Sequence, residues 1–452
     1  MQRQTTISVF LFVILILGPV LASEPESRYD QNWPQWRGPQ ATGVAPTGTP
    51  PLRWSENENI RWKRAIPGNG LAAPVIWGEQ VFVLTAVATE KKGDPNETSK
   101  AEASSATWMR KRKLAVLPYM VQQFVVLSLN RTTGGVNWQR TAHEEQPHEG
   151  THRDASWASN SPVTDGQLLF AYFGSRGLYC YDLSGNLKWQ KDLGNMRTRN
   201  GFGEGSSPAL YGDVLVVNWD QEDDSFIVAM DKTSGKELWR RERDEVTSWS
   251  TPIVVDVAGK AQVVINATNR TRGYDLQTGE VIWEIGGMTV NTIPSPVHDG
   301  STAYVMSGYR GSIVQAIRLA EAQGNLNNSS AVAWTYDRDT PYVPSPLLYG
   351  DYLYFLKVNK GLLSCLNAKD GSSLYGPVRL EGIQNIYSSP IAADGRVYLT
   401  GRSGTTMVLQ NGPDFKVLAT NQLDDKIDAS GAIAGTELYL RGHNYLYCIS
   451  ED

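Results

Sequence analysis

Residues 161–189 read SPVTDGQLLFAYFGSRGLYCYDLSGNLKW and contain one complete repeat of this chain. A Ser-Pro step comes first, and four short apolar or alternating runs follow, separated by turns rich in glycine. Alternation with a period of two, interrupted by such turns, is typical of antiparallel β-strands joined in chain order. The segment therefore predicts a four-stranded β-meander.

The same pattern recurs along most of the chain. The Ser-Pro step, or a close variant of it, has its proline at positions 74, 162, 208, 252, 296, 346 and 390, and residues 428–433 form an eighth copy with glycine in place of proline. Four-stranded units that recur at this spacing are typical of propeller blades. We predict an all-β fold, a single eight-bladed β-propeller of four-stranded antiparallel blades.

Two further positions of the repeat predict how the blades meet. The turn before the last strand ends in a glycine that supplies a positive φ, at Gly134, Gly235, Gly279 and Gly371. The last strand then carries an aromatic ring, at Trp138, Trp189, Trp239, Trp283, Trp334 and Tyr375. We expect these rings to pack between neighbouring sheets. The eighth copy has no room for its last strand, and residues 60–63, which include Trp62, have the missing pattern. An N-terminal strand is therefore predicted to close the ring.

The chain divides into three predicted segments. Arg3, an apolar run over residues 7–17 and small residues up to Ala22 are typical of a cleaved secretory signal, so residues 1–22 are predicted to direct export to the periplasm or the medium. Residues 23–59 form a segment rich in Pro and Gly, expected to lie as an extended strap across the propeller, which occupies residues 60–452. An insertion in blade one, residues 87–123, is expected to be a mobile surface loop. No stretch of the mature chain is long and apolar enough to span a membrane.

Composition excludes several classes of function. Lys and Arg number 42 against 47 Asp and Glu, which gives a net charge of −5 and no electrostatic footprint for nucleic acid. Three cysteines exclude a disulfide scaffold and a thiolate zinc cluster. Cys180, Cys365 and Cys448 occupy equivalent third-strand positions of different blades and are predicted to be buried core thiols.

The repeats resemble those of pyrroloquinoline quinone (PQQ) enzymes and of BamB-type outer-membrane assembly factors. Five stretches, residues 33–39, 173–177, 202–208, 247–252 and 340–346, are also similar to exported PQQ-binding-like propeller proteins of bacteria. The resemblance implies the propeller fold and two functions, PQQ chemistry with Ca²⁺ or the binding of protein partners. The chain lacks the adjacent Cys pair of PQQ alcohol dehydrogenases, and no Cys follows Ala22 to accept a lipid as in BamB. We interpret the shared stretches as mostly blade-building residues, and no catalytic residue is assigned.

Loops between blades and loops between second and third strands share one face of such a propeller. We place on this face a set of arginines with aromatic and polar neighbours, which could hold a planar anion such as PQQ by bidentate bonds and stacking. Salt bridges between loops are the alternative interpretation of the same residues. The set comprises Arg176, Arg197, Arg199, Glu204, Trp219, Asp220, Trp249, Asn269, Arg270, Arg272, Tyr309, Arg310, Asn359, Lys360, Arg402 and Arg441.

Three histidines, His143, His148 and His152, lie within ten residues but lack the spacing of a helical metal motif, so they are weak candidates for metal ligands. The leading hypothesis is an exported, non-catalytic propeller that serves as a binding or assembly platform for protein partners. A PQQ-dependent oxidoreductase with a divergent site and a propeller that binds a sugar or a small anionic ligand are the alternatives.

Overall fold

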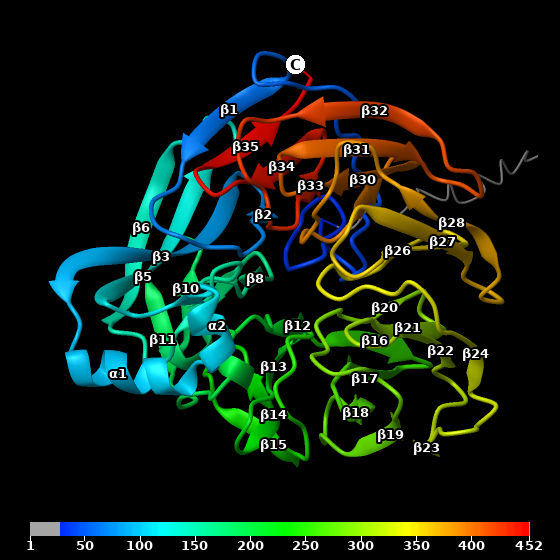
Figure 1. Ribbon diagram of the computed structural model, residues 1–452, viewed down its shortest axis with the longest axis horizontal. Coiled ribbons are helices and arrows are strands. Elements are labelled where there is room, and N and C mark those ends of the chain that lie inside the picture. The colour runs from blue at the N-terminus through cyan, green and yellow to red at the C-terminus, as the bar shows by residue number, and fades with distance from the viewer. Residues whose placement is uncertain (1–27, 452) are drawn as a thin grey trace, which may run out of the picture.

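Eight small β-sheets are arranged around a central axis in the computed structural model, which describes residues 28–451. The colours of Figure 1 run around the ring in chain order, so each blade neighbours the next blade of the sequence. Each blade is a meander of four antiparallel strands, which confirms the predicted eight-bladed propeller. The predicted signal segment, residues 1–22, lies outside the described residues. Within residues 28–451, no helix has the length and apolar character that crossing a membrane requires.

Within each blade the strands follow one another from the channel outward. Blade one contains β2 (Val75–Trp77), β3 (Gln80–Lys92), β5 (Met120–Asn130) and β6 (Val136–Glu145); blade two contains β8 (Val163–Thr164), β9 (Leu168–Tyr172), β10 (Leu178–Asp182) and β11 (Leu187–Lys191). Blade three contains β12 (Ala209–Tyr211), β13 (Val214–Trp219), β14 (Ser225–Asp231) and β15 (Glu237–Arg243); blade four contains β16 (Ile253–Val257), β17 (Lys260–Ile265), β18 (Thr271–Asp275) and β19 (Val281–Ile285), with β23 (Gly324–Asn325) added parallel to β19.

The other four blades complete the ring. Blade five contains β20 (Val297–His298), β21 (Thr302–Ser307), β22 (Ile313–Arg318) and β24 (Val332–Tyr336); blade six contains β25 (Leu347–Tyr349), β26 (Tyr352–Leu356), β27 (Leu362–Asn367) and β28 (Ser373–Arg379). Blade seven contains β29 (Ile391–Ala393), β30 (Arg396–Thr400), β31 (Thr405–Gln410) and β32 (Val417–Gln422); blade eight contains β33 (Ala432–Ala434), β34 (Glu437–Arg441), β35 (Tyr445–Ile449) and β1 (Ile60–Ala65).

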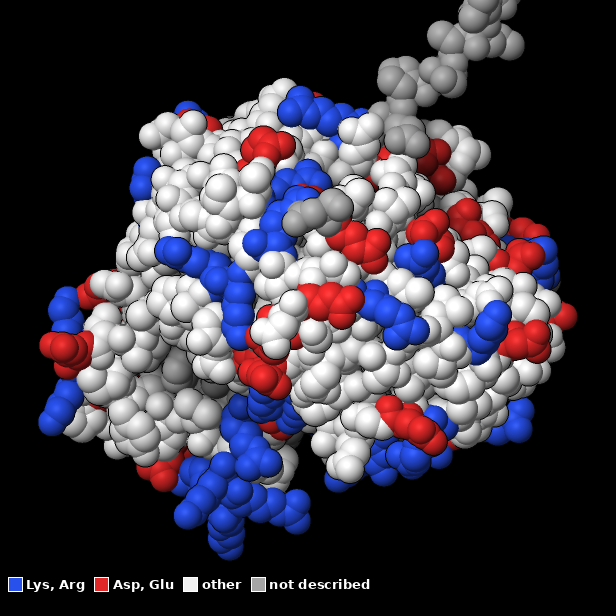
Figure 2. All heavy atoms as spheres, turned by 90° about the horizontal axis from the view of Figure 1, so that it is seen from above, with Lys and Arg blue, Asp and Glu red and all other residues white. Residues whose placement is uncertain are grey.

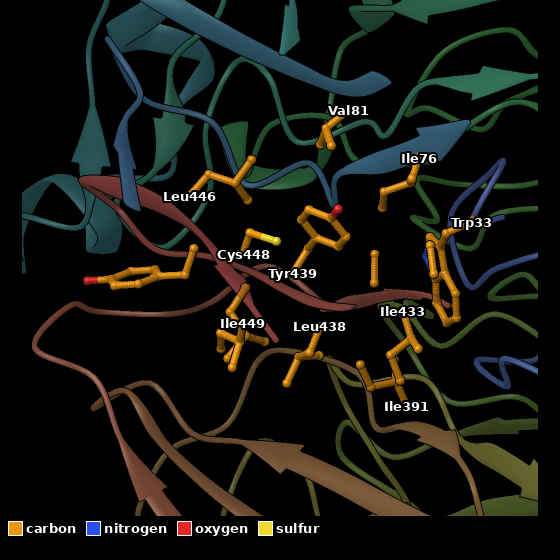
Figure 3. Packing of buried hydrophobic residues seen from close by; sticks show 14 of the residues in the cluster. Trp33, Ile76, Val81, Ile391, Ile433, Leu438, Tyr439, Leu446, Cys448 and Ile449 are labelled. Atoms are coloured by element: carbon orange, nitrogen blue, oxygen red, sulfur yellow. The ribbon is translucent and has the colours of Figure 1, made fainter. Parts of the chain in front are cut away.

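Blade eight joins the two ends of the propeller. Strand β1 pairs antiparallel with β35, with Trp62 opposite Cys448 and Lys63 opposite Tyr447. The predicted N-terminal closing strand is therefore confirmed. Successive side chains of this blade face opposite neighbours: Figure 3 shows Tyr439 and Cys448 on the side of Val81 in blade one, and Leu438 and Ile449 on the other side. A single sheet thus supplies apolar surface to both of its neighbours, and it leaves no open edge in the ring.

The three cysteines lie in this kind of environment. Cys180, Cys365 and Cys448 are buried and free, as predicted. Burial raises the pKa of each thiol to about 12. A thiol that stays protonated is neither a nucleophile nor a metal ligand, so these residues act as core packing groups.

The outer tryptophan of one blade docks on the last turn of the next blade. The indole N–H donates to a carbonyl of that turn at 2.8–2.9 Å, from Trp62 to Arg131, Trp138 to Leu183, Trp189 to Lys232, Trp239 to Leu276 and Trp334 to Ala368. The glycine of the same turn lies under the ring. A Cβ on Gly235 would approach the Trp189 ring to 2.7 Å. The turn therefore requires glycine for two reasons, its positive φ and its close contact with the ring. The predicted packing of these rings between sheets is confirmed.

Blade four is the exception among these aromatic contacts. Trp283 donates instead to the Gln262 side chain of its own blade at 3.0 Å. The connection between β22 and β24 in blade five is longer, and it places β23 against β19 where a tight turn lies in other blades. The added strand covers the outer edge of blade four.

We expect Gly235→Ala to lower the free energy of unfolding more than Gly395→Ala does. Both glycines have a φ of +67°, so both variants carry the same backbone strain, but a Cβ on Gly395 meets nothing within 4 Å. Overpacking against Trp189 should add about 1–3 kcal/mol to the loss in the Gly235 variant. Urea denaturation of both variants measures the difference, and equal losses would contradict the docking role of this turn.

Candidate functional site at the channel mouth

A ring of hydroxyl groups surrounds the central channel where the inner strands begin. The backbone N–H of each residue before the motif proline donates to the hydroxyl of the equivalent residue in the next blade. Seven such bonds, each 2.8–3.0 Å long, run from Ala73 to Ser161, Ser207, Thr251, Ser295, Ser345, Ser389 and finally Ser430. Ala73 has no hydroxyl to accept an eighth bond from blade eight. Through these hydrogen bonds, the Ser-Pro motif fixes the spacing of the blades around the channel.

Arg441 bridges the gap that Ala73 leaves. Its guanidinium reaches from blade eight to the carbonyls of Ala72 (3.1 Å) and Leu84 (2.7 Å) in blade one. Among residues 28–451 no carboxylate pairs with this fully buried group, and burial lowers its pKa to about 9. The sequence placed Arg441 on the ligand face, whereas the structure shows it holding two blades together.

The strap closes the other end of the channel. It contacts the far ends of the inner strands, because the Pro34 carbonyl accepts from Thr164 N (2.8 Å) and the Gly435 carbonyl accepts from Thr49 N (2.9 Å). From there Arg37 inserts its buried guanidinium into the channel and donates to the carbonyls of Thr42 (2.9 Å), Pro346 and Pro390. Burial without a carboxylate partner lowers the pKa of Arg37 to about 9.

A cavity of about 380 Å³ remains at the open end of the channel. Hydroxyls of the ring form part of its wall, and Trp36 of the strap also lines it. Seven aromatic side chains line it, those of Trp36, Trp108, Phe202, Trp249, Tyr309, Tyr342 and Tyr387. The charged lining residues are Asp154, Glu204 and Asp428, with His152 beside them, and no Lys or Arg is among the described lining residues. We call this the channel-mouth cavity.

Hydrogen bonds and ring contacts hold the aromatic walls. Trp249 donates its indole N–H to the Gly203 carbonyl at 2.7 Å and packs against Phe202 with ring centroids 6.1 Å apart. On another side of the cavity, Tyr309 and Tyr342 stack with centroids 4.6 Å apart and an interplanar angle of 24°, and the Arg310 guanidinium lies 5.4 Å from the centroid of the Tyr309 ring. Because Trp249 is only partly buried, its ring can receive a ligand by stacking.

Glu204 lies in a cradle built by the stretch 173–177. Its carboxylate accepts hydrogen bonds from Ser175 N (2.7 Å) and Ser175 Oγ (2.6 Å). Gly174 has a φ of +58°, and a Cβ there would lie 1.5 Å from Glu204 Oε2, so no other residue fits. Burial raises the pKa of Glu204, although Arg176 and the two Ser175 bonds oppose the shift.

The insertion of blade one forms an outer lip of the cavity. Instead of the mobile loop we expected, it contains two helices, α1 (Pro95–Ser104) and α2 (Thr107–Lys111), and a short strand β4 (Ala115–Val116) that pairs with β7 (Thr151–His152). Ala106 N donates to the Asn200 carbonyl at 3.1 Å, and Trp108 is 43% exposed with its ring 6.0 Å from that of Phe202. Figure 2 shows a group of Lys and Arg side chains projecting at the lower edge of the molecule in that view.

A network of ion pairs beside the cavity joins blades that are not neighbours. Arg402 of blade seven donates to Asp428 (2.7 Å) and to Asp154 (2.9 Å), which precedes blade two, and its guanidinium lies 3.8 Å from the centroid of the Tyr387 ring. Asp428 also contacts His443 at 3.0 Å. Burial alone would raise the pKa of Asp428, but the bonds from His443 and Arg402 hold it below its ordinary value.

The predicted ligand-binding residues separate into two groups. Glu204, Trp249, Tyr309 and Asn359 line the cavity, and Arg402 lies directly behind its wall. The other cations are engaged elsewhere: Arg176 with Glu145 and His148, Arg197 with Asp223 (2.5 Å), Arg270 with Asp244 and Glu284, and Arg272 with Asp244, Glu245 and Glu284.

The remaining members of the set also lie away from the cavity lining. Asp220 pairs with the buried Arg243 at 2.6 Å, and Trp219 stacks on Phe226 with centroids 5.5 Å apart. Asn269 donates to the Asp244 carbonyl at 2.9 Å, Arg199 N donates to Thr247 Oγ1 at 2.9 Å, and Arg310 and Lys360 are exposed. Whether any of these residues binds a ligand stays a prediction.

The lining residues that sequence reasoning missed include Trp36, Asp154, Phe202, Tyr342, Tyr387 and Asp428. A signal for three of them was present, because Trp36, Phe202 and Tyr342 lie in the five stretches that we interpreted as blade-building. These stretches are far apart in sequence, yet each contributes a residue to the cavity wall or to the Glu204 cradle.

The three histidines make separate contacts. His143 lies 2.9 Å from Glu145, His148 contacts Arg176 and the Met196 carbonyl, and His152 Nδ1 accepts from Asp154 N at 3.1 Å. Burial, followed by the charge of Arg176, lowers the pKa of His148 to about 4. Within residues 28–451, no group of three His, Cys, Asp or Glu side chains is placed to hold a metal ion.

The chain forms a ring of eight blades whose channel is closed at one end by the strap and opens at the other into a cavity with aromatic lining residues. A family model described as outer membrane protein assembly factor BamB matches residues 122–376, more than half of the chain, and the chain belongs to this family. BamB of Francisella salina is 30% identical over 122 residues, which cover 27% of this chain and 19% of that protein. The match thus spans about a fifth of that relative.

Solved structures show the same fold. BamB from Moraxella catarrhalis superposes with a TM-score of 0.52 and 12% identity, over 81% of this chain and 100% of that chain. A quinohemoprotein alcohol dehydrogenase from Pseudomonas putida gives 0.59 and 9% identity, over 94% and 80%. The computationally designed protein Ika8 gives 0.51 and 9% identity, over 74% and 93%. At these identities the likeness extends to the fold alone.

The cavity lining does not fit PQQ. This cofactor carries three carboxylates, which cations or amide donors must hold. The described lining presents three carboxylates of its own, and four of the arginines predicted to face such a ligand, Arg176, Arg197, Arg270 and Arg272, are paired with Asp and Glu outside the cavity. We therefore derive no chemistry through a quinone at this position.

We expect Glu149→Gln to change how stability depends on pH. Glu149 is 6% exposed and accepts from Thr198 N (3.1 Å) and Oγ1 (2.6 Å), and burial raises its pKa from 4.5 to about 7. Between these values the folded protein keeps a proton that the unfolded chain has released, so the wild type loses stability as the pH rises. The unfolding free energy of the variant relative to wild type should therefore rise by about 3 kcal/mol across this window.

Urea denaturation of both proteins at pH 5 and pH 7.5 measures this difference. The low pKa of His148 gives a dependence of the opposite sign, but it acts in both proteins and cancels in the comparison. A difference that stays constant between the two pH values would contradict the assignment to Glu149.

Proposed function

We propose that the protein is an exported, non-catalytic β-propeller that serves as a binding platform in the cell envelope, with the channel-mouth cavity as its binding site. The observation that carries the proposal is the one-sided channel, which Arg37 and the strap close at one end and which opens at the other between aromatic walls. A concave, largely apolar site with a few fixed polar groups is what most ligand sites have in common.

Membership of the BamB family supports a protein partner as the occupant. The relatives are described as assembly factors, and the lip formed by α1 and α2 adds exposed surface beside the cavity for such a partner. Export is part of the proposal because of the apolar run over residues 7–17. The mass of the protein recovered from its host tests export, since removal of residues 1–22 is the expected result.

A sugar or another small ligand is the second candidate occupant. The partly exposed face of Trp249 is suited to stack on a flat, weakly polar ligand as well as on a peptide. Both candidates use the same cavity, so the two differ in the size of the bound molecule and not in the site.

Photo-crosslinking in the cells that make the protein tests the platform. We expect p-benzoylphenylalanine in place of Tyr309 or Trp249 to give discrete adducts with a partner. The same residue in place of Tyr211, which is 39% exposed at the far end of an inner strand, is the matched control and should give none. Adducts at the cavity no stronger than those at Tyr211 would contradict a binding role for this cavity.

The quinoprotein alternative has its own test. We expect a titration of the purified protein with PQQ, with and without Ca²⁺, to leave its tryptophan fluorescence unchanged, because the described cavity lining holds no cation for the three carboxylates. Saturable, Ca²⁺-dependent quenching together with dye reduction on an alcohol substrate would replace the platform by an oxidoreductase.

A further inference from the structure

The insertion of blade one carries a concentration of positive charge on its outer surface. Residues 107–123 contain four Lys and Arg side chains and no Asp or Glu, in a chain whose net charge is −5. Four exposed cations of this region form no ion pair with another described residue, and we call them the basic patch: Lys111, Arg112, Lys113 and Arg153. The neighbouring Arg110 pairs with Glu102 at 3.1 Å.

The basic patch has a fixed support. Gln146, which follows β6, accepts from Asp94 N at 2.6 Å and donates to the Pro118 carbonyl at 2.8 Å, so both ends of the insertion are bonded to blade one. Arg153 N donates to the Leu114 carbonyl at 2.7 Å, which joins the basic run to the segment before blade two. Because these bonds already hold the backbone, a partner that binds here does not have to order a loop.

Helix α2 presents an aromatic ring on the same face as two of the cations. Trp108, Lys111 and Arg112 are three and four residues apart, and Arg112 N donates to the Trp108 carbonyl at 3.1 Å, so the helical turn extends to Arg112. Met109 is fully buried on another side of the helix and anchors it. The Trp108 ring stays partly open to solvent although it contacts Phe202.

The insertion also concentrates exposed apolar side chains. Trp108, Val116 and Tyr119 lie within twelve residues of sequence, and all three are exposed. The other large exposed apolar side chains of the described chain are spread over five blades, as Leu187 and Leu238 are on outer strands of blades two and three. Scattered apolar side chains are ordinary, whereas a group of them beside unpaired cations marks an interaction surface.

We propose that the basic patch, together with the rings beside it, docks the protein on a lipid bilayer whose headgroups are anionic. The negative potential of such a bilayer attracts exposed Lys and Arg, and the amphipathic rings of Trp and Tyr favour the level of the headgroups. The long stems of Lys and Arg let the charges reach the phosphates while Trp108 and Tyr119 enter the interface.

A bilayer fits this surface better than an acidic polypeptide does. A polypeptide of that kind would pair with the cations and leave Val116 and Tyr119 in water, whereas the membrane interface accommodates both kinds of side chain. The described lining of the channel-mouth cavity includes no Lys or Arg, so the basic patch lies outside it. The inference therefore goes beyond the proposed function and holds whatever the cavity binds. Because Trp108 also lines the cavity, docking brings the cavity mouth beside the membrane.

Sedimentation with sucrose-loaded vesicles tests the proposal. The purified protein is mixed with vesicles of phosphatidylglycerol and phosphatidylcholine in equal parts, or of phosphatidylcholine alone. We expect it to partition onto the anionic vesicles at least about tenfold more strongly than onto the neutral ones in low salt. About 0.5 M NaCl should abolish this preference, because salt screens exposed charges.

Charge variants locate the effect. The triple variant K111Q/R112Q/K113Q keeps most of each side-chain stem and removes three charges, so its partition onto anionic vesicles should fall about a hundredfold. The matched control removes three charges from exposed lysines of blades three, four and seven that form no ion pair with another described residue, and it should bind nearly as wild type does: K236Q/K260Q/K416Q. Thermal unfolding of each variant confirms that it is folded.

A second pair of variants tests the apolar contribution. Trp108→Ser should weaken partition onto anionic vesicles several-fold, because the ring no longer enters the interface. Leu238→Ser changes a side chain of similar exposure on blade three and should leave partition unchanged. Calorimetric titration of wild type with soluble poly-L-glutamate completes the set, and we expect binding weaker than that to the anionic vesicles.

Three results would overturn the inference. Equal partition onto anionic and neutral vesicles would show a surface without charge selection, and equal losses in the two triple variants would place the contact elsewhere. Full binding by the Trp108 variant, or poly-L-glutamate bound as tightly as the vesicles, would identify an acidic polypeptide as the partner. Failure of the platform is read separately, from the absence of crosslinked adducts at Tyr309 and Trp249.

Discussion

The hydroxyl-to-amide ring around the channel is the constraint on which the rest of this propeller depends. The motif proline has no N–H, so the residue before it must direct its own N–H across to the neighbouring blade, and Ser or Thr there provides both a donor and an acceptor. These bonds fix the blades at their inner edges, while Trp189 and its equivalents dock on a glycine turn at the outer edges. Once both edges are fixed, the loops that follow or precede them have little freedom. Most of the cavity residues lie shortly before the inner strands, so they are positioned by the same bonds that hold the ring.

The fold could be predicted from the sequence because every feature that defines it is local. Residues 161–189 contain their own strand periodicity, turn and docking tryptophan. Because this unit recurs eight times, the sequence predicts that the blades close into a ring. The N-terminal strand around Trp62 was recognisable for the same reason, since it repeats a pattern that its partner strands define.

The site could be predicted only in part because its residues come from most of the blades, the strap and the insertion. Glu204, Trp249 and Tyr309 were found because loop positions on one face can be counted from the repeat. The ion pairs of arginines such as Arg272 with Asp244 and Arg176 with Glu145 could not be predicted, because they depend on neighbours that are remote in sequence. Trp36 could not be placed without knowing that the strap inserts into the channel. The helices of the insertion have no periodic pattern that predicts Trp108 at the edge of the cavity. The five shared stretches meet at the cavity in the folded protein. Their spacing along the chain does not reveal this.

The missing hydroxyl at Ala73 marks a seam between blades one and eight, and Arg441 and strand pairing between β1 and β35 hold it closed. Strands β33 to β35 follow the other seven blades along the chain, so a polypeptide emerging from the ribosome contains the strands of those blades before it can seal the seam. Asp428 and Ser430 belong to the cavity wall and are synthesised equally late. The cavity wall is therefore complete only once the last blade has been synthesised, and a chain truncated before residue 428 lacks part of it.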